Sequence, residues 1–145
     1  MTFNYKVAAQ YLLEHVKAPL ILTAAEDVDS LIDSLERSSV GCNLAQLHSL
    51  DRSALPSGFP DHELLVGVDG ERGVGALAFM DDGNWTTLGA DIGRDEVGYS
   101  IMGHLTEFPE RSEIPIGLIR EAVKEFCASG GRRPTCVKWQ VPEYW

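Results

Sequence analysis

The feature that most limits how this chain can fold is the stretch ELLVGVDGERGVGALAFMDDGNWTTL at residues 63–88. Apolar runs of strand length alternate there with two turns that are rich in aspartate and glycine. Asp-Gly is favoured in tight hairpin turns because glycine adopts a positive φ without steric cost. We therefore expect three consecutive antiparallel strands, at residues 63–68, 73–80 and 85–88.

The N-terminal part of the chain predicts two strands and a helix. Residues 4–13 alternate weakly, which fits a strand or a short helix, and we favour the strand. A short β run follows at residues 20–22. Thr23 and Glu26 then form a capping-box pattern, after which apolar residues recur at helical spacing. The first helix should therefore run from about Ala24 to Glu36.

Two further strands, at residues 44–50 and 97–108, precede a second helix. We expect the strand at 97–108 to be broken or bulged at Gly103. Pro115 suits the first turn of the second helix, where its missing N–H costs nothing. The glycine pair at 130–131 supplies a left-handed residue that ends this helix.

A last strand at residues 135–141 completes an order of elements that is typical of the α+β class. We expect a single domain over residues 1–145, with a largely antiparallel β-sheet and two main helices packed on it. Hydrophobic residues make up 44% of the chain and charged residues 23%, which is ordinary globular composition. A chain of 145 residues can bury one core without metals or disulfides.

Composition also bears on where the protein acts. No apolar run approaches the ~20 residues that span a bilayer, so we expect no membrane association. The N-terminus lacks a basic region followed by a hydrophobic one, which is the pattern of a secretion signal. Three scattered cysteines do not form a disulfide framework. These features together predict a cytoplasmic protein with reduced thiols.

The negative charge is concentrated in the middle of the chain. The net charge is −10, and residues 61–113 alone hold 12 acidic and 3 basic residues. Such a balance argues against direct binding to DNA or RNA, because those ligands require basic residues. It suits a basic protein partner whose association would be fast and sensitive to salt. Solubility alone is the competing explanation of the charge.

No pattern in the sequence places catalytic groups in a suitable context. His62 and Glu63 begin like a zinc-protease motif, but the second histidine is missing. No two cysteines have the spacing of a zinc site, and the glycine-rich GVGALA enters a strand instead of opening a helix. We therefore expect no catalytic residues, no cofactor and no metal, and hence a protein that is not an enzyme.

A longer series of motifs resembles a known family. The series comprises the Gly-Ala-Leu strand before the acidic turn and Trp85, the Tyr99 strand, EFP at 107–109, EIP at 113–115, EF at 125–126, GGRRP at 130–134 and Trp139. It is similar to the first-numbered immunity-protein family of bacterial polymorphic toxin systems. The resemblance covers about residues 62–140, and TAAEDVDSLIDSL fits the N-terminal helix of that family.

The resemblance implies a non-catalytic α+β protein that binds and neutralises a cognate toxin made by the same cell. Such toxins often carry nucleic-acid deaminase domains or other nucleases, so the partner is expected to be basic. Two alternatives remain at this point. One is a small-molecule-binding or enzymatic α+β domain with an unseen pocket, and the other is a generic scaffold or chaperone adaptor.

We expect the partner to bind two acidic loops at one end of the sheet, around Trp85. Trp85 itself fits either an exposed anchor or a core residue of an edge strand. A neighbouring face that carries an aromatic residue, a histidine and a glutamate is the next candidate. The expected partner-binding residues are Asp81, Asp82, Trp85, Asp91, Asp95, Glu96, Tyr99, His104 and Glu107.

Overall fold

The structure, a computed structural model, describes residues 2–39, 41–90, 96–143 and 145. Its main element is one β-sheet in which every pair of neighbouring strands is antiparallel. The strands of this sheet are β1 (Thr2–Gln10), β2 (Leu20–Ala24), β3 (Leu44–Ser49), β4 (Glu63–Asp69), β5 (Val74–Met80), β6 (Asn84–Thr87), β9 (Ile114–Pro115) and β10 (Trp139–Gln140).

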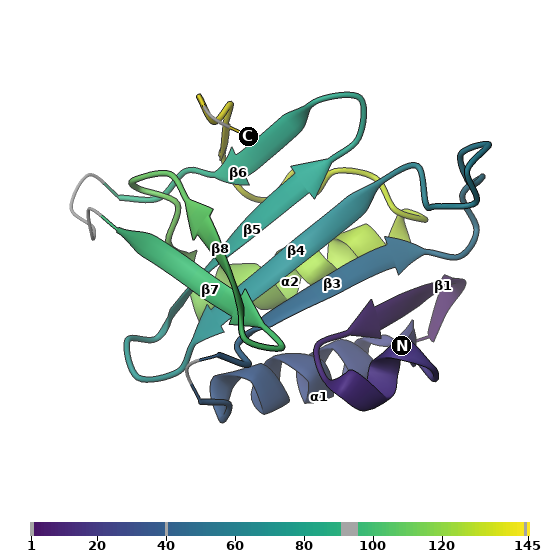
Figure 1. The fold of residues 1–145 in the computed structure, drawn as a ribbon, viewed down its shortest axis with the longest axis horizontal. Coiled ribbons are helices and arrows are strands. Elements are labelled where there is room, and N and C mark those ends of the chain that lie inside the picture. The colour runs from purple at the N-terminus through teal and green to yellow at the C-terminus, as the bar shows by residue number, and fades with distance from the viewer. Residues whose placement is uncertain (1, 40, 91–95, 144) are drawn as a thin grey trace.

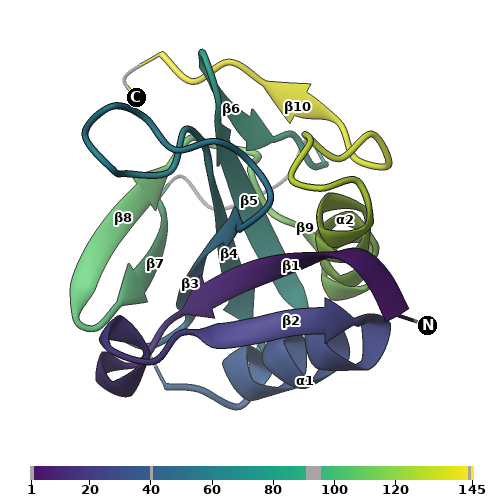
Figure 2. The same cartoon turned by 90° about the vertical axis from the view of Figure 1, so that its right-hand side faces the viewer.

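The strands lie in the order β10-β6-β5-β4-β3-β1-β2, and β9 pairs with β5 beside this path. Two helices, α1 (Ala25–Glu36) and α2 (Ile116–Ala128), cover one face of the sheet, as Figures 1 and 2 show. A short 3-10 helix, η1 (Leu13–Val16), joins β1 to β2. The α+β class expected from the sequence is thus confirmed. None of the helices in the described residues is long and apolar enough to cross a membrane.

The meander predicted from residues 63–88 is present as β4, β5 and β6. Met80 pairs with Asn84, so three residues make the turn between β5 and β6. Two of them, Asp82 and Gly83, have positive φ values of 46° and 143°. The Asp-Gly pair therefore reverses the chain where the sequence predicted.

Helix α1 begins where it was expected, but a different carboxylate caps it. The side chain of Asp27, not that of Glu26, accepts hydrogen bonds from the backbone N–H groups of Thr23 (2.8 Å) and Ala24 (3.0 Å). Asp27 occupies the third helical position after Ala24, from which a carboxylate reaches back to the start of the helix. The expected capping carboxylate, Glu26, was therefore one residue too early in the chain.

Helix α2 stops where it was predicted, but Pro115 caps its start and does not lie in its first turn. Pro115 precedes its first residue with an extended backbone, and Gly130 and Gly131 follow its end with φ values of 77° and 96°. The Gly131 N–H donates to the carbonyl of Phe126 (3.0 Å), which satisfies one of the last carbonyls of the helix. The glycine pair therefore ends the helix and turns the chain toward the sheet.

The main hydrophobic core lies between the helices and the sheet. Alternate strand residues such as Leu64, Val66 and Phe79 point into it from β4 and β5. Ile119 and Phe126 enter from α2, in keeping with the apolar face of that helix. The residues between them on β4 and β5 consequently point to the opposite face of the sheet.

On that opposite face the structure differs from the sequence prediction. Residues 97–108 form not one bulged strand but a hairpin of β7 (Val97–Ile101) and β8 (His104–Phe108), which is a separate two-stranded sheet. Met102 and Gly103 both have positive φ (48° and 81°), the pattern of a type I′ turn. The chain therefore reverses at the position where a break or a bulge within one strand was expected.

The hairpin packs on the sheet through a second, smaller core. Tyr99 and Phe108 lie edge to face, with their ring centroids 5.7 Å apart. Tyr99 covers Gly67 of β4 so closely that a Cβ there would lie 2.5 Å from Cγ of the tyrosine. Figure 2 shows the resulting layers, with the hairpin on one side of the sheet and α2 on the other.

The last strand is shorter than expected, because only Trp139 and Gln140 pair with β6. The Glu125 carboxylate of α2 accepts hydrogen bonds from the N–H groups of Thr135 (2.5 Å) and Cys136 (3.2 Å). These donors are thus satisfied by the helix and not by a neighbouring strand. The expected strand at 135–141 was correct only in its second half.

Candidate partner-binding site

The two acidic loops expected to form one patch lie apart. Asp81 and Asp82 are in the turn before β6, whereas Glu96 lies in the segment after it, just before β7. The four residues of β6 separate the β5–β6 turn from the segment before β7. Figure 1 shows this turn and this segment at opposite ends of β6. The structure therefore does not bring Glu96 together with Asp81 and Asp82. Asp91 and Asp95 lie outside the described residues.

The two aspartates of the β5–β6 turn differ in their surroundings. Asp81 is half-buried, and its carboxylate pairs with the Arg52 guanidinium at 3.0 Å. Asp82 is exposed, and no ion pair joins it to any described residue. Of this pair, Asp82 is therefore the carboxylate that remains open to a partner.

Trp85 lies at the margin of the main core and does not stand out from the surface. Its ring centroid is 6.2 Å from that of Phe79, and the guanidinium carbon of Arg133 lies 4.3 Å from the Trp85 ring centroid. That distance allows a cation–π contact. Trp85 is therefore only partly buried, and the charged group over its ring is basic, not acidic.

The second candidate face, with Tyr99, His104 and Glu107, also combines buried and exposed residues. Tyr99 is only 1% exposed, and its hydroxyl donates to the Glu113 carboxylate at 2.7 Å. The prediction that Tyr99 contacts a partner was wrong, because its strand turns this ring toward the sheet. His104 and Glu107 are exposed on β8. Glu107 also lines a hollow of about 600 Å³ between β8 and the C-terminal residues.

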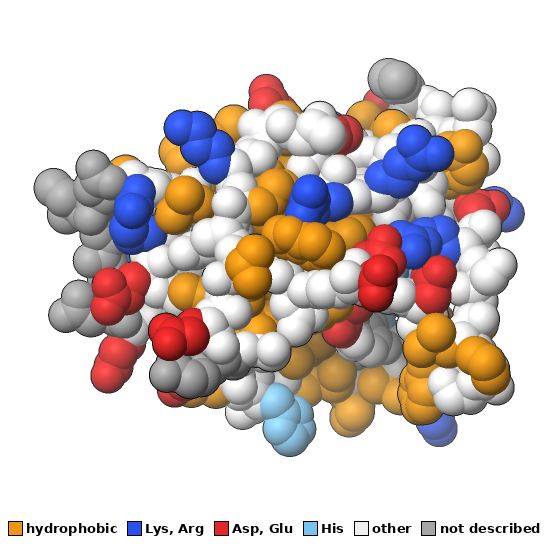
Figure 3. Space-filling model, turned by 90° about the horizontal axis from the view of Figure 1, so that it is seen from above, with side chains coloured by type: hydrophobic (Ala, Val, Ile, Leu, Met, Phe, Trp, Pro, Cys, Tyr) orange, Lys and Arg blue, Asp and Glu red, His pale blue; other side chains and the backbone are white. Residues whose placement is uncertain are grey.

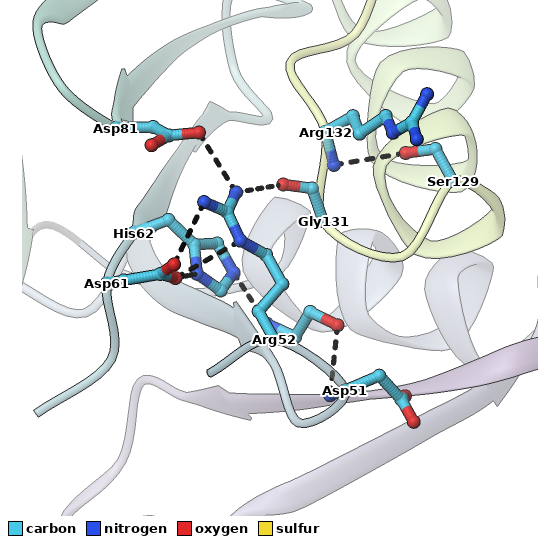
Figure 4. A network of polar contacts seen from close by, with 9 residues as sticks. Asp51, Arg52, Asp61, His62, Asp81, Ser129, Gly131 and Arg132 are labelled. Carbon is cyan, nitrogen blue, oxygen red and sulfur yellow. Dashed lines mark hydrogen bonds and ion pairs between the residues drawn. The ribbon is translucent and has the colours of Figure 1, made fainter. Parts of the chain in front are cut away.

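No pattern in the sequence indicated a network centred on Arg52. The Nε of Arg52 lies 3.1 Å from the Asp61 carboxylate, and its Nη1 donates to the carbonyl of Gly131 at 2.8 Å. Figure 4 shows these contacts together with the Asp81 pair. One arginine thus ties the loop between β3 and β4 to the β5–β6 turn and to the segment after α2.

His62 is held inside this network. Its Nε2 accepts a hydrogen bond from the Ser49 N–H (2.8 Å), so the ring proton lies on Nδ1, 2.8 Å from the Asp61 carboxylate. Burial lowers the pKa of His62 below its ordinary value, although Asp61 acts in the opposite direction. Both ring nitrogens are engaged, so the imidazole is not available as a base toward a substrate.

Two adjoining hollows lie beside the network, where β4 begins and β5 ends, and we call them together the sheet-end hollow. Their volumes are about 260 and 190 Å³. The lining residues are Gln46, His48, Phe59, Pro60, Asp61, His62, Glu63, Met80, Asp81, Asp82, Gly83 and Asn84. No group of three or more His, Cys, Asp or Glu side chains among the described residues could hold a metal ion.

Of the twelve lining residues the sequence analysis expected only Asp81 and Asp82, and among those that it missed are Glu63 and Phe59. Glu63 is half-buried in β4, and burial raises the pKa of its carboxyl group although the Gln46 amide donates to it. Phe59 lies in a loop and is 71% exposed. The position of Phe59 between glycine and proline in a polar loop was the one available signal, because Phe59 belongs to no recognised motif and Glu63 only to an incomplete one.

Charge and apolar groups meet on the surface around this end of the sheet. In Figure 3, which views the molecule from above, acidic side chains lie beside basic ones and next to exposed hydrophobic groups toward the right of the view. Such a mixture is usual for a protein–protein interface, in which apolar anchors are surrounded by polar groups. The arrangement can therefore bind another protein surface.

Comparison with known proteins agrees with this description. The model of the family described as immunity protein Imm1 matches residues 17–141. The match begins in the connection before β2 and extends just past β10, so it includes both helices and the β7–β8 hairpin. A search of curated proteins gives no match. Because the family match covers most of its length, the chain belongs to the Imm1 immunity protein family.

Proposed function

We propose that this Imm1 protein acts in the bacterial cytoplasm, where it binds and neutralises a cognate polymorphic toxin that acts on nucleic acid, as a deaminase or a nuclease. The family match supports a toxin as the partner. The charge distribution supports the kind of toxin, since residues 61–113 hold 12 acids against 3 bases. A protein that handles nucleic acid needs a basic cleft, and an acidic surface complements one.

We propose further that neutralisation works by binding and not by catalysis, and that the protein binds its toxin and not nucleic acid. The observation that carries the proposal is the combination of family membership with an acidic sheet-end surface. In that surface the one buried histidine is fully engaged by Ser49 and Asp61. The remaining groups can form ion pairs and apolar contacts.

Co-expression with the toxin encoded beside the gene tests the proposal. Cells that induce the toxin should stop growing, and cells that also express this protein should grow. Purified toxin should lose its activity in proportion to the added protein and reach zero at one-to-one stoichiometry. Loss of activity at far less than one equivalent would instead indicate catalytic inactivation. Continued killing with both proteins folded and abundant would refute the function.

A further inference from the structure

The sheet-end hollow has an excess of negative charge after its internal ion pairs are counted. Arg52 contacts both Asp61 and Asp81, which accounts for two of the four carboxylates around the hollow. The other two, Glu63 and Asp82, have no cationic partner among the described residues. The hollow therefore presents two carboxylates that a positive group from outside could pair with.

Glu63 is the more informative of the two. It lines both parts of the hollow and is half-buried in β4, with the neutral Gln46 amide as its hydrogen-bond donor. Partial burial of a carboxylate without a counter-charge is unfavourable, because the protein replaces only part of its hydration. A cation that entered the hollow would remove this penalty, so the site is complementary to a basic group.

Phe59 supplies an apolar surface at the edge of the same hollow. The loop that carries it is ordered by backbone contacts. The Leu55 N–H donates to the Phe59 carbonyl and the Gly58 N–H to the Leu55 carbonyl, both at 2.8 Å. Gly58 has a φ of 90°, which permits this tight loop, and Ala54 pairs with Pro60. The backbone that carries the exposed ring is thus ordered before any partner arrives, which lowers the entropy cost of binding.

We propose that an arginine side chain of the cognate toxin enters the sheet-end hollow, where it pairs with Glu63 and Asp82 and stacks on Phe59; this inference rests on the proposed function. Arginine fits better than lysine for a chemical reason. Its planar guanidinium donates five N–H groups in a fixed fork and also stacks on aromatic rings. The hollow offers both kinds of contact side by side.

The test compares binding of the purified toxin by wild-type protein and by matched variants. Phe59→Ala should weaken binding by about 30-fold or more, as expected when an aromatic anchor is lost. Glu63→Gln should weaken it by about tenfold or more. Leu13→Ala, at a residue 79% exposed on η1, is the apolar control. Glu121→Gln, on the exposed side of α2, is the charge control. Both controls should stay within about twofold of the wild type.

Thermal unfolding separates loss of binding from loss of fold. Phe59→Ala should leave Tm unchanged because the ring is exposed. Since the pKa of Glu63 is raised in the folded state, this group favours folding only at acid pH, and its contribution is lost as pH rises through that pKa. Glu63→Gln should therefore raise Tm by about 1–3 °C at pH 7. It should leave Tm unchanged below the ordinary pKa of 4.5.

The identity of the incoming group is tested from the toxin side. Arginines of the toxin are replaced singly by alanine and measured against wild-type protein and Glu63→Gln. One replacement should weaken binding to the wild type about tenfold and have much less effect on binding to Glu63→Gln. If the wild type neutralises the toxin while Phe59→Ala and Glu63→Gln bind like their controls, the inference is wrong and the function stands. If the wild type does not bind the toxin, both fail.

Discussion

Thr86 and Thr87 are neighbours in β6, and both side chains are fully buried. They point to opposite faces of the sheet and differ in their hydrogen bonds. The Thr87 hydroxyl accepts from the Leu77 N–H (3.1 Å) and donates to the carbonyl of Ser112 (2.6 Å). The Thr86 hydroxyl oxygen has no partner among the described residues. The two threonines therefore contribute to stability in opposite directions.

Replacing each of these threonines by valine, which has nearly the same shape, should change stability in opposite directions. Thr86→Val should raise the free energy of unfolding by about 1 kcal/mol, because it removes a buried hydroxyl that forms no hydrogen bond. Thr87→Val should lower it by about 1–3 kcal/mol, because Leu77 and Ser112 lose their partner. Urea denaturation of the two variants measures both changes, and destabilisation of similar size in both would contradict this account.

At the scale of the elements, the β7–β8 hairpin depends on Gly67. A Cβ at this position would lie 2.5 Å from Cγ and 2.8 Å from Cδ1 of Tyr99. The Tyr99 side chain cannot easily move away, because its ring packs against Phe108 and its hydroxyl donates a hydrogen bond to Glu113. The absence of a side chain in β4 is thus what allows the hairpin to approach the sheet.

Gly67→Ala should therefore lower the free energy of unfolding by about 1–3 kcal/mol, the usual cost of overpacking a core. Gly117→Ala is the matched control, because a Cβ on this helical glycine would have no described atom within 4 Å and its φ is not positive. Alanine there should raise stability by about 0.5–1 kcal/mol. Thermal unfolding of the two variants gives the comparison. Equal shifts of the same sign would show that the contact with Tyr99 is unimportant.

The elements that could be predicted from the sequence are those set by neighbouring residues. The β4–β5–β6 meander follows from short apolar runs and an Asp-Gly turn, and α2 follows from its apolar spacing and its glycine stop. The hairpin at 97–108 was missed because Met102 gives no sign of a positive φ, which asparagine or glycine would have given.

The surroundings of the candidate site were harder to predict than the fold, because a contact with a distant part of the chain holds the Arg52 network beside it. Arg52 reaches Gly131, which is 79 residues away in the chain. The sequence likewise does not show on which side of its strand the Tyr99 ring lies. The packing of the hairpin on the sheet turns the ring inward. Asp82 was among the expected residues because it belongs to a turn that the local sequence specifies. Glu63 was not, because its significance lies in its half-buried position and in the lack of a nearby cation among the described residues.

At the scale of the whole molecule, charge should govern how fast the toxin is captured. The chain carries a net charge of −10, and most of the excess lies in residues 61–113. Raising the salt concentration from about 0.05 to 0.5 M should lower the association rate with a basic toxin by about tenfold or more, with a much smaller effect on dissociation. Stopped-flow mixing over a salt series measures both rates.

The location of the charge can be separated from its total. Asp82→Asn and Glu14→Gln change the net charge by the same amount, but Glu14 is exposed on η1 and does not line the sheet-end hollow. Only Asp82→Asn should slow association and flatten its dependence on salt. Identical behaviour of the two variants would show that net charge alone attracts the toxin.

The sheet-end hollow has a further property that follows from the order of its strands. Its lining residues all lie between Gln46 and Asn84, in one uninterrupted part of the chain. The strands β3, β4, β5 and β6 pair there in chain order, so this region closes through local contacts, which form quickly. Under the proposed mode of binding, a single short stretch of the gene encodes the recognition surface. Recombination within that stretch could exchange the toxin specificity without changing the sequence of either helix.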